Sequence, residues 1–217
     1  MNKINIAVIT CLLVLAFLTV VLDDLDILVS TYFYGSGNFS SHFILKVIHK
    51  LVPVFITSLI IGLLITLAYS HFKKQYKLRK RILYLILCLA IGPGLIVNTI
   101  FKNNFGRARP NQVVYFGGEK NHSQPFILSK ECSKNCSFVS GHAAAGFYTT
   151  AFAYVMKGGF NPKIYLAGLL LGFITGIARI IQGGHFLSDI LFSGIFVITV
   201  NYFLYRRMFR DKEGIYS

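Results

Sequence analysis

Long apolar segments separated by short polar ones run along most of the chain. A helix needs about 20 apolar residues to cross the hydrocarbon core of a bilayer, and six segments reach or approach that length. They lie at about residues 4–22, 51–69, 82–101, 141–156, 164–181 and 187–205. The pattern predicts an all-α fold, a polytopic membrane helix bundle of six transmembrane helices that forms a single domain over residues 1–217.

The fifth apolar segment carries a regular pattern of small residues. A glycine recurs at every fourth position, at Gly168, Gly172 and Gly176. Small residues at this spacing share one face of a helix and let a neighbouring helix approach closely. We therefore expect this face of the fifth span to lie inside the bundle.

Residues 102–140, between the third and fourth spans, form the only long polar connection. Connections of this length in compact domains tend to be functional. Cys132 and Cys136 lie four residues apart in it, a spacing that fits a disulfide in an oxidising compartment. No second pair of ligands has the spacing of a zinc site, so no metal is predicted here.

The composition excludes an ordinary soluble fold. Hydrophobic residues make up 54% of the chain, charged residues make up 14%, and the mean hydropathy is +0.61. A formal net charge of +14 would suggest nucleic acid as the partner of a soluble protein. In this apolar background we assign the charge to anionic lipid and to membrane topology. The bilayer is thus the expected partner, nucleic acid is rejected, and no obligate protein partner is evident.

The distribution of positive charge predicts how the bundle is oriented. Six spans place both termini on one side of the membrane, and that side carries 13 of the 22 Lys and Arg residues. Because cytoplasmic loops are enriched in Lys and Arg, we expect the termini in the cytoplasm. The basic residues left on the outer side need another purpose, and phosphate binding would supply one.

This topology gathers polar residues at the outer ends of the spans, where three separate chain segments converge. These residues are Lys102, Arg109, Ser140, Gly141, His142, Arg179, His185 and Asp189. Taken singly, basic residues at span ends are typical of interfacial anchors, and Ser-Gly-His at a helix start is typical of a cap. Their joint placement favours a functional site.

The segment A-R-I-I-Q-G-G-H-F-L-S-D combines a nucleophile with its partner. If the helix resumes at Gly184, His185 and Asp189 lie four residues apart on one face, and the carboxylate can bond one ring nitrogen. The other nitrogen is then free to attack. Gly183 and Gly184 allow close backbone approach, and Arg179 offers a fork of donors suited to phosphate oxygens.

Three motifs in this order carry a family resemblance. The chain contains K-x6-R-P from Lys102, S-G-H from Ser140 and R-x5-H-x3-D from Arg179. Together they resemble the type 2 phosphatidic acid phosphatase (PAP2) superfamily, with an active-site core at about residues 102–189. Val139 stands where the family pattern has proline, and Ala178 where it has serine. Neither departure removes a titrating group, so activity is expected.

The resemblance implies a phosphatase that needs neither metal nor cofactor. His185 would attack phosphorus to form a phosphohistidine, and Asp189 would orient it. His142 would protonate the leaving oxygen and later activate water. The residues implied to hold the phosphoryl oxygens are Lys102, Arg109, Ser140, Gly141 through its backbone amide, and Arg179.

The loop and the histidine segment most resemble the branch of bacterial lipid A phosphatases, of the 4'-phosphatase type. That implies removal of the lipid A 4'-phosphate at the periplasmic face of the bacterial inner membrane, which would weaken binding of cationic antimicrobial peptides. Alternatives within the superfamily are an undecaprenyl pyrophosphate phosphatase, a phosphatidylglycerol phosphate phosphatase or a lipid phosphotransferase. From another class, a non-catalytic phospholipid-binding or transport protein would keep its function after His185→Ala.

Arg107 and four histidines are left over. Arg107, in G-R-A-R-P, leaves two alternatives open, a further phosphate contact or a surface charge. The four histidines show no paired spacing, and we expect them to be interfacial or solvated. They are His42, His49, His71 and His122.

Overall fold

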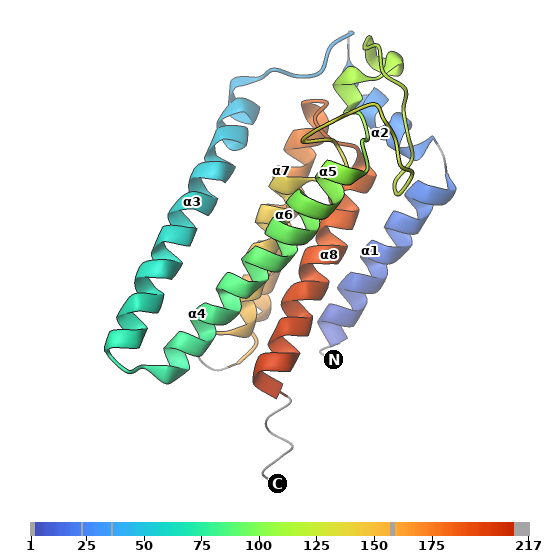
Figure 1. Cartoon of the computed structure of the whole chain (residues 1–217). Coiled ribbons are helices and arrows are strands. Elements are labelled where there is room, and N and C mark those ends of the chain that lie inside the picture. Colours follow the sequence, from blue (N-terminus) through green and yellow to red (C-terminus); the bar gives the residue numbers. More distant parts are fainter. Residues whose placement is uncertain (1–2, 23, 36, 157–158, 211–217) are drawn as a thin grey trace.

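The computed structural model describes residues 3–22, 24–35, 37–156 and 159–210, which form a bundle of helices (Figure 1). Within these ranges there is no β-strand, only an isolated bridge between Val113 and Lys120. The longer helices are α1 (Lys3–Val21), α3 (Phe43–Phe72), α4 (Tyr76–Leu89), α7 (Pro162–Ile181) and α8 (Leu187–Tyr205). The predicted all-α fold is confirmed.

Shorter helical pieces complete the bundle. Helix α4 continues through the π-helical η1 (Ala90–Phe101) into α5 (Lys102–Asn104), and α6 (Gly141–Tyr148) continues into the 3-10 helix η4 (Thr149–Tyr154). The others are α2 (Leu25–Tyr34), η2 (Pro110–Gln112), η3 (Val114–Phe116) and η5 (Arg206–Arg210). In Figure 1, α2 and α5 lie at the end of the bundle opposite to the start of α1 and the end of α8.

Within the described residues, five helical segments are long and apolar enough to cross a membrane. They are Lys3–Val21, Phe43–Phe72, Tyr76–Asn104, Pro162–Ile181 and Leu187–Phe209. The segment expected to be the fourth span forms α6 and η4, which are shorter than the other five. The chain is therefore a multi-pass membrane protein, while the count of six crossings stays a prediction.

The glycine face of α7 packs inside the bundle, as predicted. A Cβ on Gly172 would lie 2.2 Å from the Phe147 ring, and a Cβ on Gly176 would lie 2.5 Å from Ile190. The backbone of Gly172 is in turn so close to Gly146 that a Cβ there would lie 2.6 Å from its Cα. These contacts bring α6 and α8 against α7, and so bring their outer ends together.

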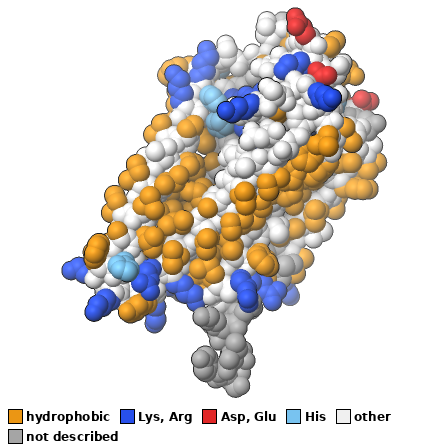
Figure 2. Space-filling view, in the orientation of Figure 1, with side chains coloured by type: hydrophobic (Ala, Val, Ile, Leu, Met, Phe, Trp, Pro, Cys, Tyr) orange, Lys and Arg blue, Asp and Glu red, His pale blue; other side chains and the backbone are white. Residues whose placement is uncertain are grey.

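The surface agrees with a membrane environment. Hydrophobic side chains form a broad band between two ends where Lys and Arg gather (Figure 2). Helix α3 stands to one side of the bundle in Figure 1, and only 6% of its most apolar stretch is buried. Cavities of about 330 Å³ and 260 Å³ border α3, one shared with η1 near Asn98 and one shared with α6 and α7.

Candidate active site

The expected site residues meet where the 102–140 connection crosses the helix ends. The backbone N–H of Ser140, just before α6, donates to the carbonyl of Asp189 in α8 over 3.1 Å. A Cβ on Gly141 would lie 3.6 Å from Lys102 Nζ. Three segments far apart in the sequence therefore share one end of the bundle, as expected from the positions of the site residues at the ends of the predicted spans.

His185 lies beside Asp189, but not on the helix that the sequence suggested. Helix α8 begins only at Leu187, and the Phe186 N–H donates to Asp189 Oδ2 over 2.9 Å at its start. This capping contact, and not a shared helix face, brings His185 Nδ1 to 3.4 Å from the same oxygen. The expected resumption of the helix at Gly184 is thus wrong, although the expected pair forms.

The surroundings of His185 suit a nucleophile. Its side chain is only 1% exposed, and burial lowers the pKa of His185 to about 3, so its imidazole is neutral at physiological pH. The carboxylate of Asp189 accepts at Nδ1, which keeps the proton on that nitrogen and leaves Nε2 free. A neutral imidazole with one unprotonated nitrogen can attack phosphorus.

Asp189 is itself held by further donors that the motifs do not contain. Arg107 Nη1 donates to its Oδ1 over 2.8 Å, and Ser137 Oγ donates to its Oδ2 over 2.5 Å. Both donors come from the 102–140 connection and are fully buried. The connection therefore contributes to the site by fixing the carboxylate that orients His185.

Arg107 is neither a phosphate contact nor a surface charge, so both alternatives left open by the sequence are wrong. Its side chain is 1% exposed and forms 2.8 Å ion pairs with Asp189 and with Asp26 of α2. The Ser188 hydroxyl accepts from Arg107 and donates to Asp26, and the guanidinium carbon lies 4.3 Å from the centre of the Phe186 ring. Burial of these three charges requires such paired, hydrogen-bonded geometry. The network links α2 to the start of α8.

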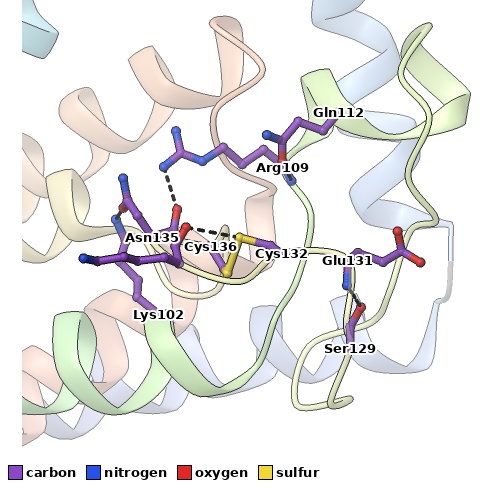
Figure 3. Close-up of a disulfide and its surroundings, with 9 residues drawn as sticks. Lys102, Arg109, Gln112, Ser129, Glu131, Cys132, Asn135 and Cys136 are labelled. Carbon is purple, nitrogen blue, oxygen red and sulfur yellow. Dashed lines mark hydrogen bonds between the residues drawn. A yellow bond between two sulfur atoms is a disulfide. The ribbon is translucent and has the colours of Figure 1, made fainter.

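The three expected phosphate-binding cations lie close together and use few of their donors. Lys102 Nζ donates to Asn135 Oδ1 over 2.8 Å, and Arg109 Nη2 donates to the Asn135 carbonyl over 2.9 Å (Figure 3). Arg179 lies near enough to interact electrostatically with both, and donates to Gln182 Oε1. Its buried Nε has no hydrogen-bond partner within the described residues. The cluster therefore retains donors for a phosphate's oxygens.

Ser140 and Gly141 begin α6. The Ser140 hydroxyl accepts from the Ala143 N–H over 3.4 Å and is fully buried, so it acts as the helix cap. A Cβ on Gly141 would lie 2.9 Å from Asn98 Oδ1, which explains why a glycine stands there. The N–H of Gly141 is among the first in the helix, and such groups favour anions.

Two of the four leftover histidines lie at the site. His49 is exposed, as expected, but its ring stacks on that of His142, with centroids 4.5 Å apart and an interplanar angle of 20°. His122 is partly buried and lies 3.1 Å from Arg107 Nη2, so its expected interfacial or solvated position is wrong. Neither could be placed by spacing alone, because each reaches the site from a different part of the chain.

Metal ligands do not gather in the described part of the chain. No three His, Cys, Asp or Glu residues come together there as a binding group. The polar groups at the site are instead the His185–Asp189 pair, His142 and the cation cluster. A histidine–aspartate pair, a second histidine and a cluster of cationic donors are the kinds of group that phosphoryl transfer requires.

The part of the sequence that carries the candidate site matches a known protein family. The model of the PAP2 superfamily matches residues 83–213, which is more than half of the chain and includes every residue of the expected site. The chain belongs to the PAP2 superfamily.

Individual proteins with similar sequences are lipid A phosphatases. The lipid A 4'-phosphatase of Francisella tularensis subsp. novicida is 38% identical over 204 residues, 89% of this chain and 90% of the relative. The lipid A 4'-phosphatase of Rhizobium leguminosarum is 36% identical over 115 residues (52% of this chain, 48% of the relative). The lipid A 1-phosphatase of Porphyromonas gingivalis is 33% identical over 81 residues, which are 36% of this chain and 18% of the relative. No solved structure gives a significant match. The chain is a PAP2-type lipid phosphatase, and so a phosphoric monoester hydrolase.

A disulfide supports the cation cluster. Cys132 and Cys136 are joined, and Asn135, between them, accepts from both Lys102 and Arg109 (Figure 3). Replacing both cysteines by serine removes a closure worth about 2 kcal/mol for so short a loop. We expect the KM for phosphorylated lipid to rise severalfold with little change in kcat, because Asn135 then no longer fixes the two cations.

Steady-state kinetics of the double Cys132→Ser/Cys136→Ser variant test this expectation. The matched control is Cys11→Ala, which changes an exposed free cysteine of α1. A double variant with the KM of the parent protein would show that the disulfide has no part in placing the cations.

Gly184 leaves room for the Arg179 guanidinium. A Cβ on Gly184 would lie 2.2 Å from Arg179 Nη2, and the end of this flexible side chain would have to move. We expect Gly184→Ala to fold normally and to raise KM about tenfold or more, since one charge-assisted hydrogen bond to phosphate is displaced. Gly62→Ala in α3, where a Cβ meets nothing within 4 Å, is the control. An unchanged KM would exclude Arg179 from phosphate binding.

Proposed function

We propose that this protein removes the 4'-phosphate of lipid A at the periplasmic face of the bacterial inner membrane, without a metal, through a phosphohistidine on His185. The observation that carries the proposal is the buried His185–Asp189 pair at the bundle end where Lys102, Arg109 and Arg179 gather. The nearly full-length similarity to a lipid A 4'-phosphatase supports the choice of substrate.

The reaction proceeds in two steps on these groups. In the first, His185 Nε2 forms a bond to phosphorus while the bond between phosphorus and the sugar oxygen breaks, and His142, as the imidazolium, gives that oxygen a proton and becomes neutral. In the second, His142 takes a proton from water, whose oxygen attacks phosphorus, and the bond to His185 breaks. Phosphate and dephosphorylated lipid leave, and both histidines return to their starting states.

The cation cluster lowers the barrier of both steps. Negative charge spreads over three phosphoryl oxygens in the transition state, and donors already fixed around those oxygens stabilise it most. Lys102, Arg109 and Arg179 supply this charge, and the N–H of Gly141 adds a backbone donor. Asp189 keeps the proton of His185 on Nδ1, which directs Nε2 to the phosphate.

The distribution of charge and the disulfide support the proposed orientation in the membrane. The turn between α3 and α4 lies at the end of the bundle opposite to the site (Figure 1). This turn and the start of α4 are rich in Lys and Arg, as cytoplasmic loops are. The Cys132–Cys136 disulfide lies at the site, and disulfides persist in oxidising compartments such as the periplasm. Both features support a cytoplasmic location of the termini and a periplasmic site.

Phosphate release by the purified protein in detergent with EDTA tests the proposal. The substrates are lipid A, undecaprenyl pyrophosphate and phosphatidylglycerol phosphate. Each is also given to His185→Ala and to a control variant, His71→Ala, which changes a histidine in the last turn of α3. We expect release from lipid A, lost only in His185→Ala, with mass spectrometry showing a free 4'-hydroxyl. Preferred release from another lipid, or loss of the 1-phosphate, would contradict the proposed substrate, and release that survives His185→Ala would contradict the mechanism.

A further inference from the structure

Helix α3 contains a proline that leaves one backbone carbonyl near the site without its helical hydrogen bond. Pro53 lies inside the helix, which runs from Phe43 to Phe72. Proline has no backbone N–H, so it cannot donate to the carbonyl four residues earlier. In α3 that carbonyl belongs to His49, which is therefore left without its helical hydrogen bond.

The carbonyl of His49 finds a donor in the active site instead. His142 Nε2 lies 3.2 Å from it, and because a carbonyl only accepts, the proton must be on Nε2. The ring of His49 stacks on that of His142 at the same place. A residue one turn along α3 thus frees the group that fixes the protonation of a site histidine.

We propose that Pro53 and His49 form a positioning device, in which the freed carbonyl and the stacked ring hold His142 with its proton on Nε2. Nδ1 of His142 is then the nitrogen that exchanges protons with the leaving oxygen and with water. The assignment of Nδ1 rests on the proposed function, whereas the tautomer and its dependence on Pro53 do not. Pro53 and the His49 carbonyl act through His142 and touch no substrate.

The device matters because burial, and after it the neighbouring positive charge, disfavours the charged form of His142 and lowers its pKa. The charged or titratable groups that face His142 are Arg179 from α7, Lys102 from α5 and His49 itself from α3. Each disfavours an imidazolium, which His142 must be when it protonates the leaving oxygen. A hydrogen bond from Nε2–H to a carbonyl favours the imidazolium and so offsets this repulsion.

Pro53→Ala tests the device while leaving the side chains of His142 and His49 unchanged. Alanine restores an N–H that competes for the His49 carbonyl, and it suits a helix better than proline does. We expect kcat to fall on the order of tenfold, well short of the ~10²–10⁴-fold that a general acid contributes, with KM nearly unchanged. The alkaline limb of the kcat profile should move to lower pH, because the imidazolium of His142 loses its acceptor.

A neighbouring variant controls for a general disturbance of α3. Val54 is 60% exposed, and Val54→Ala alters the helix surface without altering its hydrogen bonds. It should keep the kcat and the pH profile of the parent protein. If Pro53→Ala raises KM and leaves the pH profile in place, the proline only shapes α3 and the proposal is overturned.

The tautomer can be read without any assay of activity. In protein labelled with ¹⁵N-histidine, the His142 signals, assigned by their loss in His142→Gln, should report a proton on Nε2 and none on Nδ1 near neutral pH. In Pro53→Ala the two tautomers should mix. A proton on Nδ1 in the parent protein would overturn the device, whereas failure of the proposed function would appear only as absent phosphate release.

His49→Phe separates the carbonyl from the imidazole. Phenylalanine keeps a flat ring on His142 and leaves the backbone carbonyl in place, so we expect kcat within about twofold of the parent and an unchanged tautomer. His49→Ala should lose part of the positioning, because only the carbonyl remains. If His49→Phe lowers kcat as much as Pro53→Ala does, the imidazole of His49 is the active group, and the proposal fails.

Discussion

Replacing Arg107 by alanine is expected to destabilise the protein by about 3–5 kcal/mol, the usual result of removing one partner from a buried ion pair. Arg107 is 1% exposed and pairs with Asp26 and Asp189, both equally buried. Its loss leaves two carboxylates close together without a counter-charge. We expect a lower unfolding temperature in detergent, and loss of turnover in the fraction that stays folded, because Asp189 is no longer fixed.

Arg206→Ala is the matched control for Arg107→Ala. Arg206 follows α8 at the opposite end of the bundle and is exposed, and single surface substitutions of this kind change stability by about 0.5 kcal/mol or less. Thermal unfolding followed by circular dichroism compares the two. Equal unfolding temperatures for both variants would mean that the Arg107 network contributes nothing to stability.

Asp189→Asn is expected to lower kcat by on the order of 10³–10⁴-fold, as loss of the orienting carboxylate does in a histidine–aspartate pair. The amide has nearly the same shape, so the fold should be retained in part. Its NH₂ group can donate where the carboxylate accepts, which disfavours a proton on His185 Nδ1 and turns the wrong nitrogen to phosphorus. Phosphate release under saturating lipid measures the effect.

Asp26→Asn provides the comparison, since it makes the same change at the other end of the same network. Asp26 pairs with Arg107 and accepts from Ser188, but it makes no contact with His185. We expect a loss of stability with a much smaller loss of kcat. If the two variants lose kcat equally, the carboxylate of Asp189 has no orienting role beyond the stability of the network.

The sequence predicts the fold class and the main site residues because both depend on local patterns. Long apolar segments identify the helices, and a four-residue glycine repeat identifies the packed face of α7. The R-x5-H-x3-D motif brings His185 to Asp189 even though the helix starts three residues later than expected. The length of α6 is harder to predict from sequence, because its glycine and alanine residues do not indicate where the helix ends.

The parts of the site that the sequence does not predict all depend on contacts between distant segments. Asp26 lies in α2, and nothing in its neighbourhood indicates a pair with Arg107. An aspartate inside an apolar helix and a second arginine in G-R-A-R-P are the only signals, and each is ambiguous alone. The link from Pro53 to His142 is similar, because the proline shows which carbonyl is free but not which donor meets it.

The phosphorylated enzyme tests the account most directly. The protein is mixed with lipid A in EDTA, quenched in alkali to preserve phosphohistidine, digested and analysed by mass spectrometry, in parallel with His185→Ala. We predict phosphate on His185 that depends on lipid A and is absent in His185→Ala. Phosphate on another residue, or turnover that EDTA stops, would contradict the account.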